Sequence, residues 1–179
     1  MSKYKKLKNY EQVLMDVEDI LGSGVTTNDQ LDKIGNSVFK NDYWGTFSSD
    51  KMPLRIKDNQ CFILNTDSSR SANKYGHWVG FYKLNGKLWY YDSFARPKEK
   101  LSKWWKNKRM YNAIKTDRDQ SFEESSCGSR SMAWLIVFRK YGERCIDIIW
   151  MFFMILCLTM SDYMIFGNEM YYFVTLCMP

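Results

Sequence analysis

Residues 77–92 read HWVGFYKLNGKLWYYD, two apolar runs on either side of Asn85-Gly86. Asn-Gly between apolar runs indicates a tight β-hairpin, because both residues tolerate positive φ angles. We therefore predict strands at 77–83 and 87–91. Two antiparallel strands joined by a tight turn bring their far ends together. His77 and Asp92 stand at those ends, so they should be neighbours at one edge of a sheet.

Elements on both sides of the hairpin complete an α+β pattern. Apolar residues at helical spacing, capping residues and short apolar runs indicate the other helices and strands. The fold class that we expect is a small mixed β-sheet flanked by helices, with Cys127 at the N-terminus of a central helix. The expected elements are helices at 10–21, after Thr27-Asn28, after Pro97 and from Cys127 to near Gly142, strands at 61–64 and around 111–115, and irregular chain over 41–58.

Charge divides the chain into a basic part and an apolar tail. Residues 1–144 hold all 26 Lys and Arg and 17 of the 20 Asp and Glu. Residues 145–179 hold no basic residue and three acids, although the whole chain carries a net charge of +6. With 179 residues, the chain is long enough to bury a core without disulfide or metal staples. We expect a basic arm with an N-terminal helix at 1–25, one folded domain at 26–145, and an extension at 146–179.

The five cysteines are odd in number and form no CxxC pair, so we interpret them as reduced thiols. The N-terminus is rich in Lys and lacks an apolar core, so no secretory signal is visible. We expect a protein that is not secreted. Within the tail, residues 148–160 form a run of 13 uncharged residues, shorter than the roughly 20 apolar residues of a membrane-spanning helix. We expect a buried C-terminal helix there, with membrane-surface association as the alternative.

His77 is the only histidine of the chain, so an imidazole general base must be this residue. The carboxylate of Asp92 can accept a hydrogen bond from one ring nitrogen, fix the tautomer and support the imidazolium. The alternatives are an idle histidine at a sheet edge and an aspartate that satisfies only its own turn.

Cys127 lies in the polar stretch SSCGS (residues 125–129), directly before an apolar helix. Serines are natural helix caps, and a helix N-terminus carries about half a positive charge, which stabilises a thiolate. The first helical amides can also donate to an oxyanion, and the side-chain amide of Gln120, seven residues earlier, is a further candidate donor. The alternative for a free cysteine is a small buried hydrophobe, which suits Cys61 and the tail cysteines because their neighbours are apolar.

Residues 98–109 (KEKLSKWWKNKR) interleave two tryptophans with six basic residues. One interpretation is a nucleic-acid contact through the phosphates. The other is a helix with Leu101, Trp104 and Trp105 packed inward and a solvated basic face. No metal-ligand spacing surrounds the single histidine and no Gly-rich phosphate loop is present, so we expect no metal and no required cofactor. The candidate phosphate contacts are Lys103, Lys106, Lys108 and Arg109.

The order of these groups resembles the adenovirus-type (adenain-like) maturation proteases and their relatives, the proteases of ubiquitin-like modifiers. The resemblance consists of His-Trp, a strand, Asp-Ser-Phe, and then Gln and Ser-x-Cys-Gly before a helix. It covers about residues 26–142. Further segments similar to the adenovirus type are 29–31 (DQL), 44–47 (WGTF), 62–66 (FILNT) and 76–81 (GHWVGF).

The resemblance implies a cysteine endopeptidase that processes capsid or virion precursor proteins after small, Gly-type residues. The roles it implies are Cys127 as nucleophile, His77 as base, Asp92 as the group that orients the histidine, and Gln120 as oxyanion donor. It also implies a source such as a virophage or a related DNA virus, a location in the virion, the host cytoplasm or the viral factory, and stimulation by DNA. No cysteine lies between Phe94 and Gln120, where the adenovirus enzyme carries its linking cysteine, so we expect no disulfide-linked peptide activator.

Three other functions are alternatives. A deconjugase of ubiquitin-like proteins would employ the same groups, and residues 91–93 (YDS) are more similar to that branch than to the adenovirus branch. An acyltransferase would form the same thioester and pass the acyl group to an amine or a hydroxyl. A non-catalytic, basic nucleic-acid-binding virion protein would use only the cationic surface.

Overall fold

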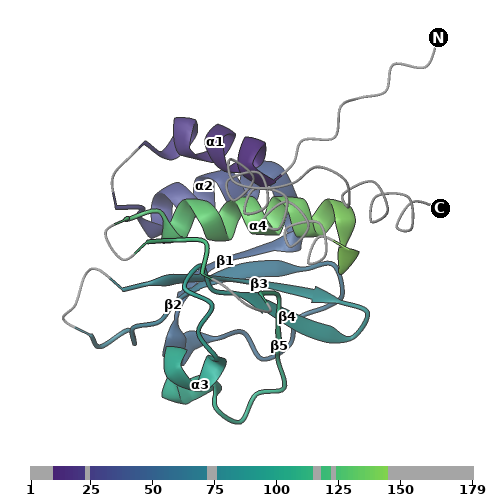
Figure 1. The fold of residues 1–179 in the computed structure, drawn as a ribbon. Coiled ribbons are helices and arrows are strands. Elements are labelled where there is room, and N and C mark those ends of the chain that lie inside the picture. The colour runs from purple at the N-terminus through teal and green to yellow at the C-terminus, as the bar shows by residue number, and fades with distance from the viewer. Residues whose placement is uncertain (1–9, 23–24, 72–75, 115–117, 122–123, 145–179) are drawn as a thin grey trace, which may run out of the picture. The chain divides into compact units, whose positions relative to one another are not determined.

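A computed structural model describes residues 10–22, 25–71, 76–114, 118–121 and 124–144 (Figure 1). The elements in chain order are α1 (Tyr10–Leu21), α2 (Asn28–Phe39), η1 (Lys40–Asp42), β1 (Tyr43–Ser48), η2 (Ser49–Lys51), β2 (Cys61–Asn65), β3 (Trp78–Leu84), β4 (Lys87–Tyr91), α3 (Lys98–Leu101), η3 (Lys103–Trp105), β5 (Tyr111–Asn112) and α4 (Cys127–Tyr141). Of the predicted N-terminal part at 1–25, the structure describes helix α1 but not the basic arm at 1–9. The predicted extension at 146–179 also lies outside the described residues.

The strands form one mixed sheet in the order β1-β2-β3-β4-β5. β1 pairs parallel with β2, and β4 with β5, while the pairs β2–β3 and β3–β4 are antiparallel. The predicted hairpin is present, with Asn85 and Gly86 at positive φ angles of 52° and 73°. The predicted α+β class with a small mixed sheet is therefore confirmed.

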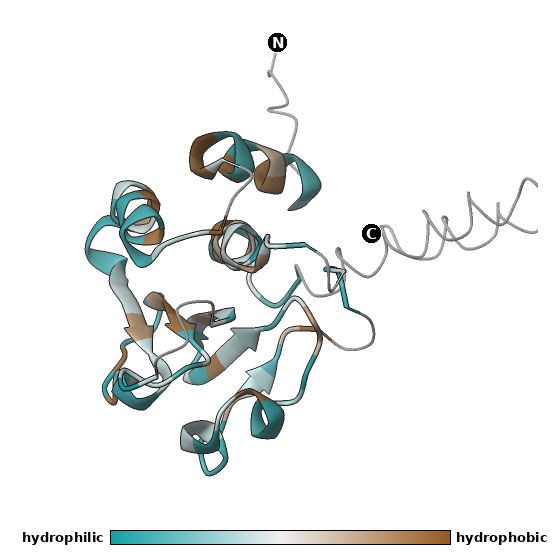
Figure 2. Cartoon of the chain, turned by 90° about the vertical axis from the view of Figure 1, so that its left-hand side faces the viewer, coloured by the Kyte–Doolittle hydropathy of each residue, from teal (hydrophilic) through white to brown (hydrophobic). Residues whose placement is uncertain are grey.

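Helix α4 lies between α1 and one face of the sheet, as Figure 2 shows in a view nearly along its axis. It is buried on almost every side, from Gly128 to Phe138. Its close approach to β3 depends on Gly80, because a Cβ there would lie 3.1 Å from the Trp134 ring and 3.2 Å from the carbonyl oxygen of Ser131. This packing holds the N-terminus of α4 over the beginning of β3.

Helix α3 lies on the side of the sheet opposite α4 (Figure 1). A second apolar layer, which includes Leu101 and Trp105, packs against that face of the sheet. Phe62 and Phe81 stack with ring centroids 4.9 Å apart, and Trp105 meets Phe81 edge-on at 5.2 Å. The Trp105 indole N–H donates to the Ser49 carbonyl (3.2 Å), so its polar atom is satisfied although the side chain is fully buried. With both faces covered, the sheet can fix the positions of side chains at its strand ends.

Local sequence signals explain the two N-terminal helices. α1 has the predicted bounds of 10–21. α2 begins with a capping box, in which Thr27 Oγ1 accepts from the Gln30 backbone N–H (3.3 Å) and Gln30 Oε1 accepts from the Thr27 backbone N–H (2.9 Å). No described helix has the length and apolar character needed to cross a membrane.

The prediction of irregular chain over 41–58 is wrong in part, because β1 lies there. Gly45 has a φ of 114°, and the register with β2 shifts between Tyr43 and Thr46. Such a bulge disrupts the alternation by which a strand is recognised in a sequence.

The basic segment 98–109 is not one helix either. Helix α3 ends at Leu101, and Ser102 is extended and accepts from the Trp104 N–H to start the 3-10 turn η3. Leu101 and Trp105 are buried, as expected for a structural helix, but Trp104 is half-exposed.

Candidate active site

His77 and Asp92 are neighbours at the open end of the hairpin, as predicted. His77 directly precedes β3, Asp92 directly follows β4, and His77 Nε2 is hydrogen-bonded to Asp92 Oδ1. Thr66 fixes the backbone of His77 from β2, because its N–H donates to the His77 carbonyl (2.8 Å) and its hydroxyl accepts from the His77 N–H (3.2 Å). A Cβ at Gly76 would meet Asn65 Oδ1 at 1.7 Å, so a larger residue there would displace the Asn65 side chain from its hydrogen bond with the Asp67 N–H.

The carboxylate of Asp92 is fully buried and also binds Arg96. The guanidinium donates from Nε to Oδ2 (3.0 Å) and from its terminal nitrogen to Oδ1 (3.2 Å), and the Arg96 backbone N–H donates to Oδ2 (2.8 Å). Burial alone would raise the pKa of Asp92, but the hydrogen bonds from His77 and Arg96 outweigh it and lower the pKa to about 2. The carboxylate is thus ionised, and its hydrogen bonds with Arg96 hold it beside the imidazole of His77.

Arg96 reaches back to Asp92 through a tight turn. Ala95 has a φ of 54°, and its N–H donates to the Asp92 carbonyl (2.8 Å). Sequence analysis missed Arg96. The only signal was a cation four residues after the aspartate, and the sequence does not show that the chain turns back.

Cys127 is the first residue of the 15-residue helix α4. Ser126 holds the N-cap position, but its side chain makes no cap and accepts instead from Arg130 Nε (2.9 Å). The expected serine cap is therefore absent, and no side chain from the cap position occupies the first amides of the helix. Of those amides, the Gly128 N–H acts on the sulfur and helps to lower its pKa, as does the positive end of the helix dipole.

Cys127 and His77 lie close enough for each side chain to shift the pKa of the other. Burial opposes ionisation of the thiol, but His77 and the backbone N–H groups of Trp78 and Gly128 outweigh it, so the pKa of Cys127 lies below its ordinary value. Burial likewise opposes the imidazolium, but Asp92 and the Cys127 thiolate outweigh it and raise the pKa of His77. The arrangement favours a thiolate–imidazolium pair.

The loop between α1 and α2 supports the start of α4. A Cβ at Gly128 would lie 2.7 Å from the Cβ of Thr26, so only glycine fits beside this residue. The Trp78 indole N–H donates to the Thr26 carbonyl (3.0 Å). Thr26 thus connects the residue after His77 with the residue after Cys127.

Gln120 is buried and joined to the residue after Asp92. Its side-chain oxygen accepts from the Ser93 hydroxyl (2.5 Å), and its side-chain nitrogen donates to the Glu124 carbonyl (2.6 Å). An amide nitrogen carries two hydrogens, so one N–H remains for another acceptor. The structure thus ties Gln120 to the strand end that carries Asp92 and to the segment that leads into Cys127.

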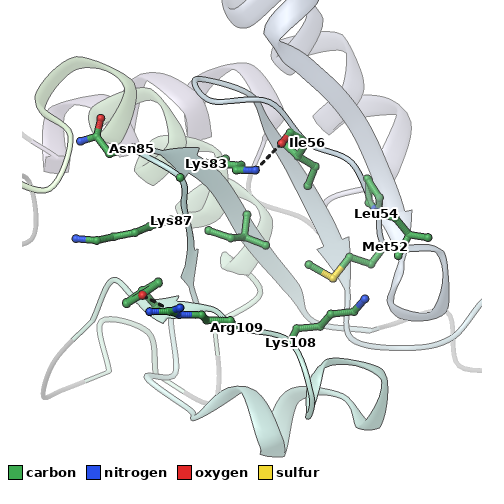
Figure 3. Close-up of a pocket in the computed structure, with 12 residues that line it drawn as sticks. Met52, Leu54, Ile56, Lys83, Asn85, Lys87, Lys108 and Arg109 are labelled. Carbon is green, nitrogen blue, oxygen red and sulfur yellow. Dashed lines mark hydrogen bonds between the residues drawn. The ribbon is translucent and has the colours of Figure 1, made fainter.

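The four predicted phosphate contacts are separate from this cluster. Lys103 and Lys106 are exposed, and the Lys103 ammonium lies over the Trp104 ring, 5.2 Å from its centroid. Lys108 and Arg109 line a pocket of about 460 Å³ at the turn end of the hairpin (Figure 3). The seven residues of β3 separate His77 from the turn, a span of roughly 23 Å. Within the described residues, no group of three or more His, Cys, Asp or Glu side chains is placed to hold a metal ion.

Alkylation should distinguish Cys127 from Cys61. Iodoacetamide at mildly acidic pH should label Cys127 first, because the pKa of its thiol is lowered, whereas burial raises the pKa of Cys61, which is fully inaccessible. Peptide mapping by mass spectrometry measures the labelled fraction of every cysteine, and the denatured protein should label uniformly. Preferential labelling of any other cysteine in the folded protein would contradict the assignment.

No family model matches the chain, and no curated protein matches it. The interpretation of the site therefore depends on its geometry and chemistry.

Proposed function

We propose that the protein is a cysteine endopeptidase with Cys127 as its nucleophile. The observation that carries the proposal is the hydrogen bond between His77 and Asp92 beside Cys127, a thiol whose pKa His77 lowers and which stands at the start of a buried helix. An idle histidine would need no buried carboxylate, and a structural cysteine would not have a lowered pKa.

In the proposed reaction, the Cys127 thiolate attacks the scissile carbonyl carbon. The carbonyl electrons move onto the oxygen, which receives hydrogen bonds from the Cys127 backbone N–H and from the remaining N–H of Gln120. The His77 imidazolium gives its proton to the departing amine as the C–N bond breaks. His77, now neutral, removes a proton from water, and the resulting hydroxide attacks the thioester to release the acid and the thiolate.

The substrate that we propose is a protein precursor with small residues before the cleaved bond, in keeping with the resemblance to viral maturation proteases. The direct test is incubation of the purified protein with a capsid precursor from the same source, followed by mass spectrometry of the new termini. Cleavage that is abolished by Cys127→Ala supports the proposal. Cleavage confined to fusions of ubiquitin-like proteins would identify a deconjugase, and product formation only with an added acyl acceptor would identify an acyltransferase.

A second role, binding of DNA, is favoured by the charge around the pocket of Figure 3. Lys83, Lys87, Lys108 and Arg109 contribute to its lining, and neither Asp nor Glu is among the described lining residues. Lys83 donates to the Ile56 carbonyl (2.8 Å), and Lys87 lies 3.4 Å from Glu143. Lys108 and Arg109 are therefore the members best placed to donate hydrogen bonds to phosphate oxygens.

The DNA-binding variant combines Lys103→Gln, Lys106→Gln, Lys108→Gln and Arg109→Gln. It should bind DNA more weakly and with a flatter salt dependence, because each phosphate contact contributes about −0.9 to the slope of log K against log salt. Fluorescence anisotropy with a short duplex at several salt concentrations measures the slope. Lys33→Gln on α2 is the control and should change it little. An unchanged slope in the variant would refute this surface. Hydrolysis of a short peptide should be unaffected.

A further inference from the structure

A buried polar cluster beside the site has no part in the mechanism above. The phenol oxygens of Tyr10 and Tyr91 lie 2.7 Å apart, and both groups donate to Asp119 Oδ2, Tyr10 at 3.0 Å. Arg130 lies 3.5 Å from the same oxygen. The four residues come from α1, β4, the loop before α4, and α4 itself. Asp119 is adjacent to Gln120, so the cluster holds the segment that carries the proposed oxyanion donor.

The backbone of Asp119 and Gln120 is hydrogen-bonded to Ser93, two residues after the end of β4. Both backbone N–H groups donate to the Ser93 carbonyl, at 3.0 and 3.2 Å. The Glu124 carbonyl can only accept, so it fixes which end of the Gln120 amide is the nitrogen. The direction of the remaining N–H therefore depends on where the backbone of these two residues lies.

Arg130 also holds the other end of the same segment. Its Nε donates to Ser126 Oγ (2.9 Å), and a terminal nitrogen donates to Glu124 Oε2 (3.2 Å). One guanidinium thus contacts Asp119 before Gln120, and Glu124 and Ser126 after it. Ser126 immediately precedes Cys127, so this guanidinium sets the spacing between the amide donor and the nucleophile.

We propose that Asp119 and Arg130 are positioning residues for the Gln120 oxyanion donor, with Tyr10 as their support from α1. The proposal rests on the function proposed above. An oxyanion donor is effective only at about 2.7–3.1 Å from the developing charge, and a misplacement of about 1 Å can cost roughly 100-fold in rate. The cluster supplies the rigidity that this distance requires, because it links three elements of the fold through part-buried, charge-assisted contacts to Asp119.

The test is a double-mutant cycle between Asp119→Asn and Gln120→Ala in the full chain. Asp119→Asn should lower kcat for a fluorogenic peptide amide ending in Gly-Gly by roughly 10- to 100-fold and leave KM within about twofold. In the Gln120→Ala background the same substitution should cost almost nothing further, because the donor that it positions is already absent. The alkylation rate of Cys127 should be unchanged, since the thiol–imidazole pair lies outside the cluster. Tyr10→Phe removes one hydrogen bond and should give the same pattern with a smaller loss.

Additive losses in the cycle would overturn the proposal, because Asp119 would then act independently of Gln120. A parallel fall in alkylation and kcat would also overturn it, since that pattern indicates general damage to the site. If the wild-type protein has no peptidase activity that depends on Cys127, the proposed function fails, and this inference fails with it. Tyr10→Phe keeps the test decisive if Asp119→Asn does not fold.

Discussion

Replacing Cys127 by Ala should lower peptide hydrolysis by about 10⁴-fold or more, and His77→Ala should do nearly the same, because neither member of the pair works alone. The double variant should be no slower than either single variant. Cys61→Ala is the matched control. Cys61 is equally free of disulfides but lies fully buried in β2, so the rate should stay near that of the wild type. Steady-state kinetics with active-site titration measures all four proteins.

An unchanged rate in Cys127→Ala would remove the thiol mechanism altogether. A rate that depends on Cys127 but not on His77 would require another base. His77 is the only histidine of the sequence, so that base would have to be a carboxylate or a water.

Asp92→Asn should lower kcat by about 10³- to 10⁴-fold while the protein stays folded. The side-chain NH2 group of Asn can only donate, whereas both oxygens of Asp92 accept. In the variant, an N–H of His77 or Arg96 would therefore point at the N–H groups of the Asn amide. The imidazole then loses its fixed tautomer, and the raised pKa of His77 should fall. The measurement is the pH profile of Cys127 alkylation, whose acid limb should move to higher pH as the thiolate loses its imidazolium partner. Arg96→Lys keeps the positive charge and should cause a much smaller loss, and a wild-type rate in Asp92→Asn would mean that another group orients His77.

The same carboxylate predicts how stability depends on pH. The pKa of Asp92 is about 2 in the folded protein, below its ordinary value of 3.8. A depressed pKa stabilises the fold at pH values above the unfolded pKa, and this contribution is lost as the pH falls through the folded pKa. The difference in Tm between the wild type and Asp92→Asn should therefore be largest between about pH 4 and the ordinary His77 pKa of 6.5. It should shrink as the pH approaches 2, and also at high pH, where the raised pKa of His77 no longer stabilises the wild type. A difference that grows on acidification below about pH 4 would contradict the ionised, paired state of Asp92.

The parts of the structure that were predicted from the sequence depend on short-range signals. The Asn85-Gly86 turn fixes the hairpin, and the hairpin fixes the proximity of His77 and Asp92, so one local motif predicts a contact between residues 15 positions apart. Helix α2 was likewise indicated by Thr27, a local cap.

The parts that were missed depend on interactions that no local pattern encodes. β1 is interrupted by a bulge at Gly45, and the basic segment is broken at Ser102 by a side-chain hydrogen bond. The guanidiniums of Arg96 and Arg130 bind carboxylates across turns and between elements. Their roles depend on backbone directions that only the folded chain defines.

Asp92 and Ser93 are consecutive residues, yet they hold different halves of the proposed machinery. The carboxylate of Asp92 holds the base, and the hydroxyl and carbonyl of Ser93 hold the side chain and backbone of Gln120. The turn after β4 thus fixes the positions of both His77 and Gln120. A substitution that shifts this turn would therefore displace the imidazole and the amide together, while the thiol on α4 stays in place.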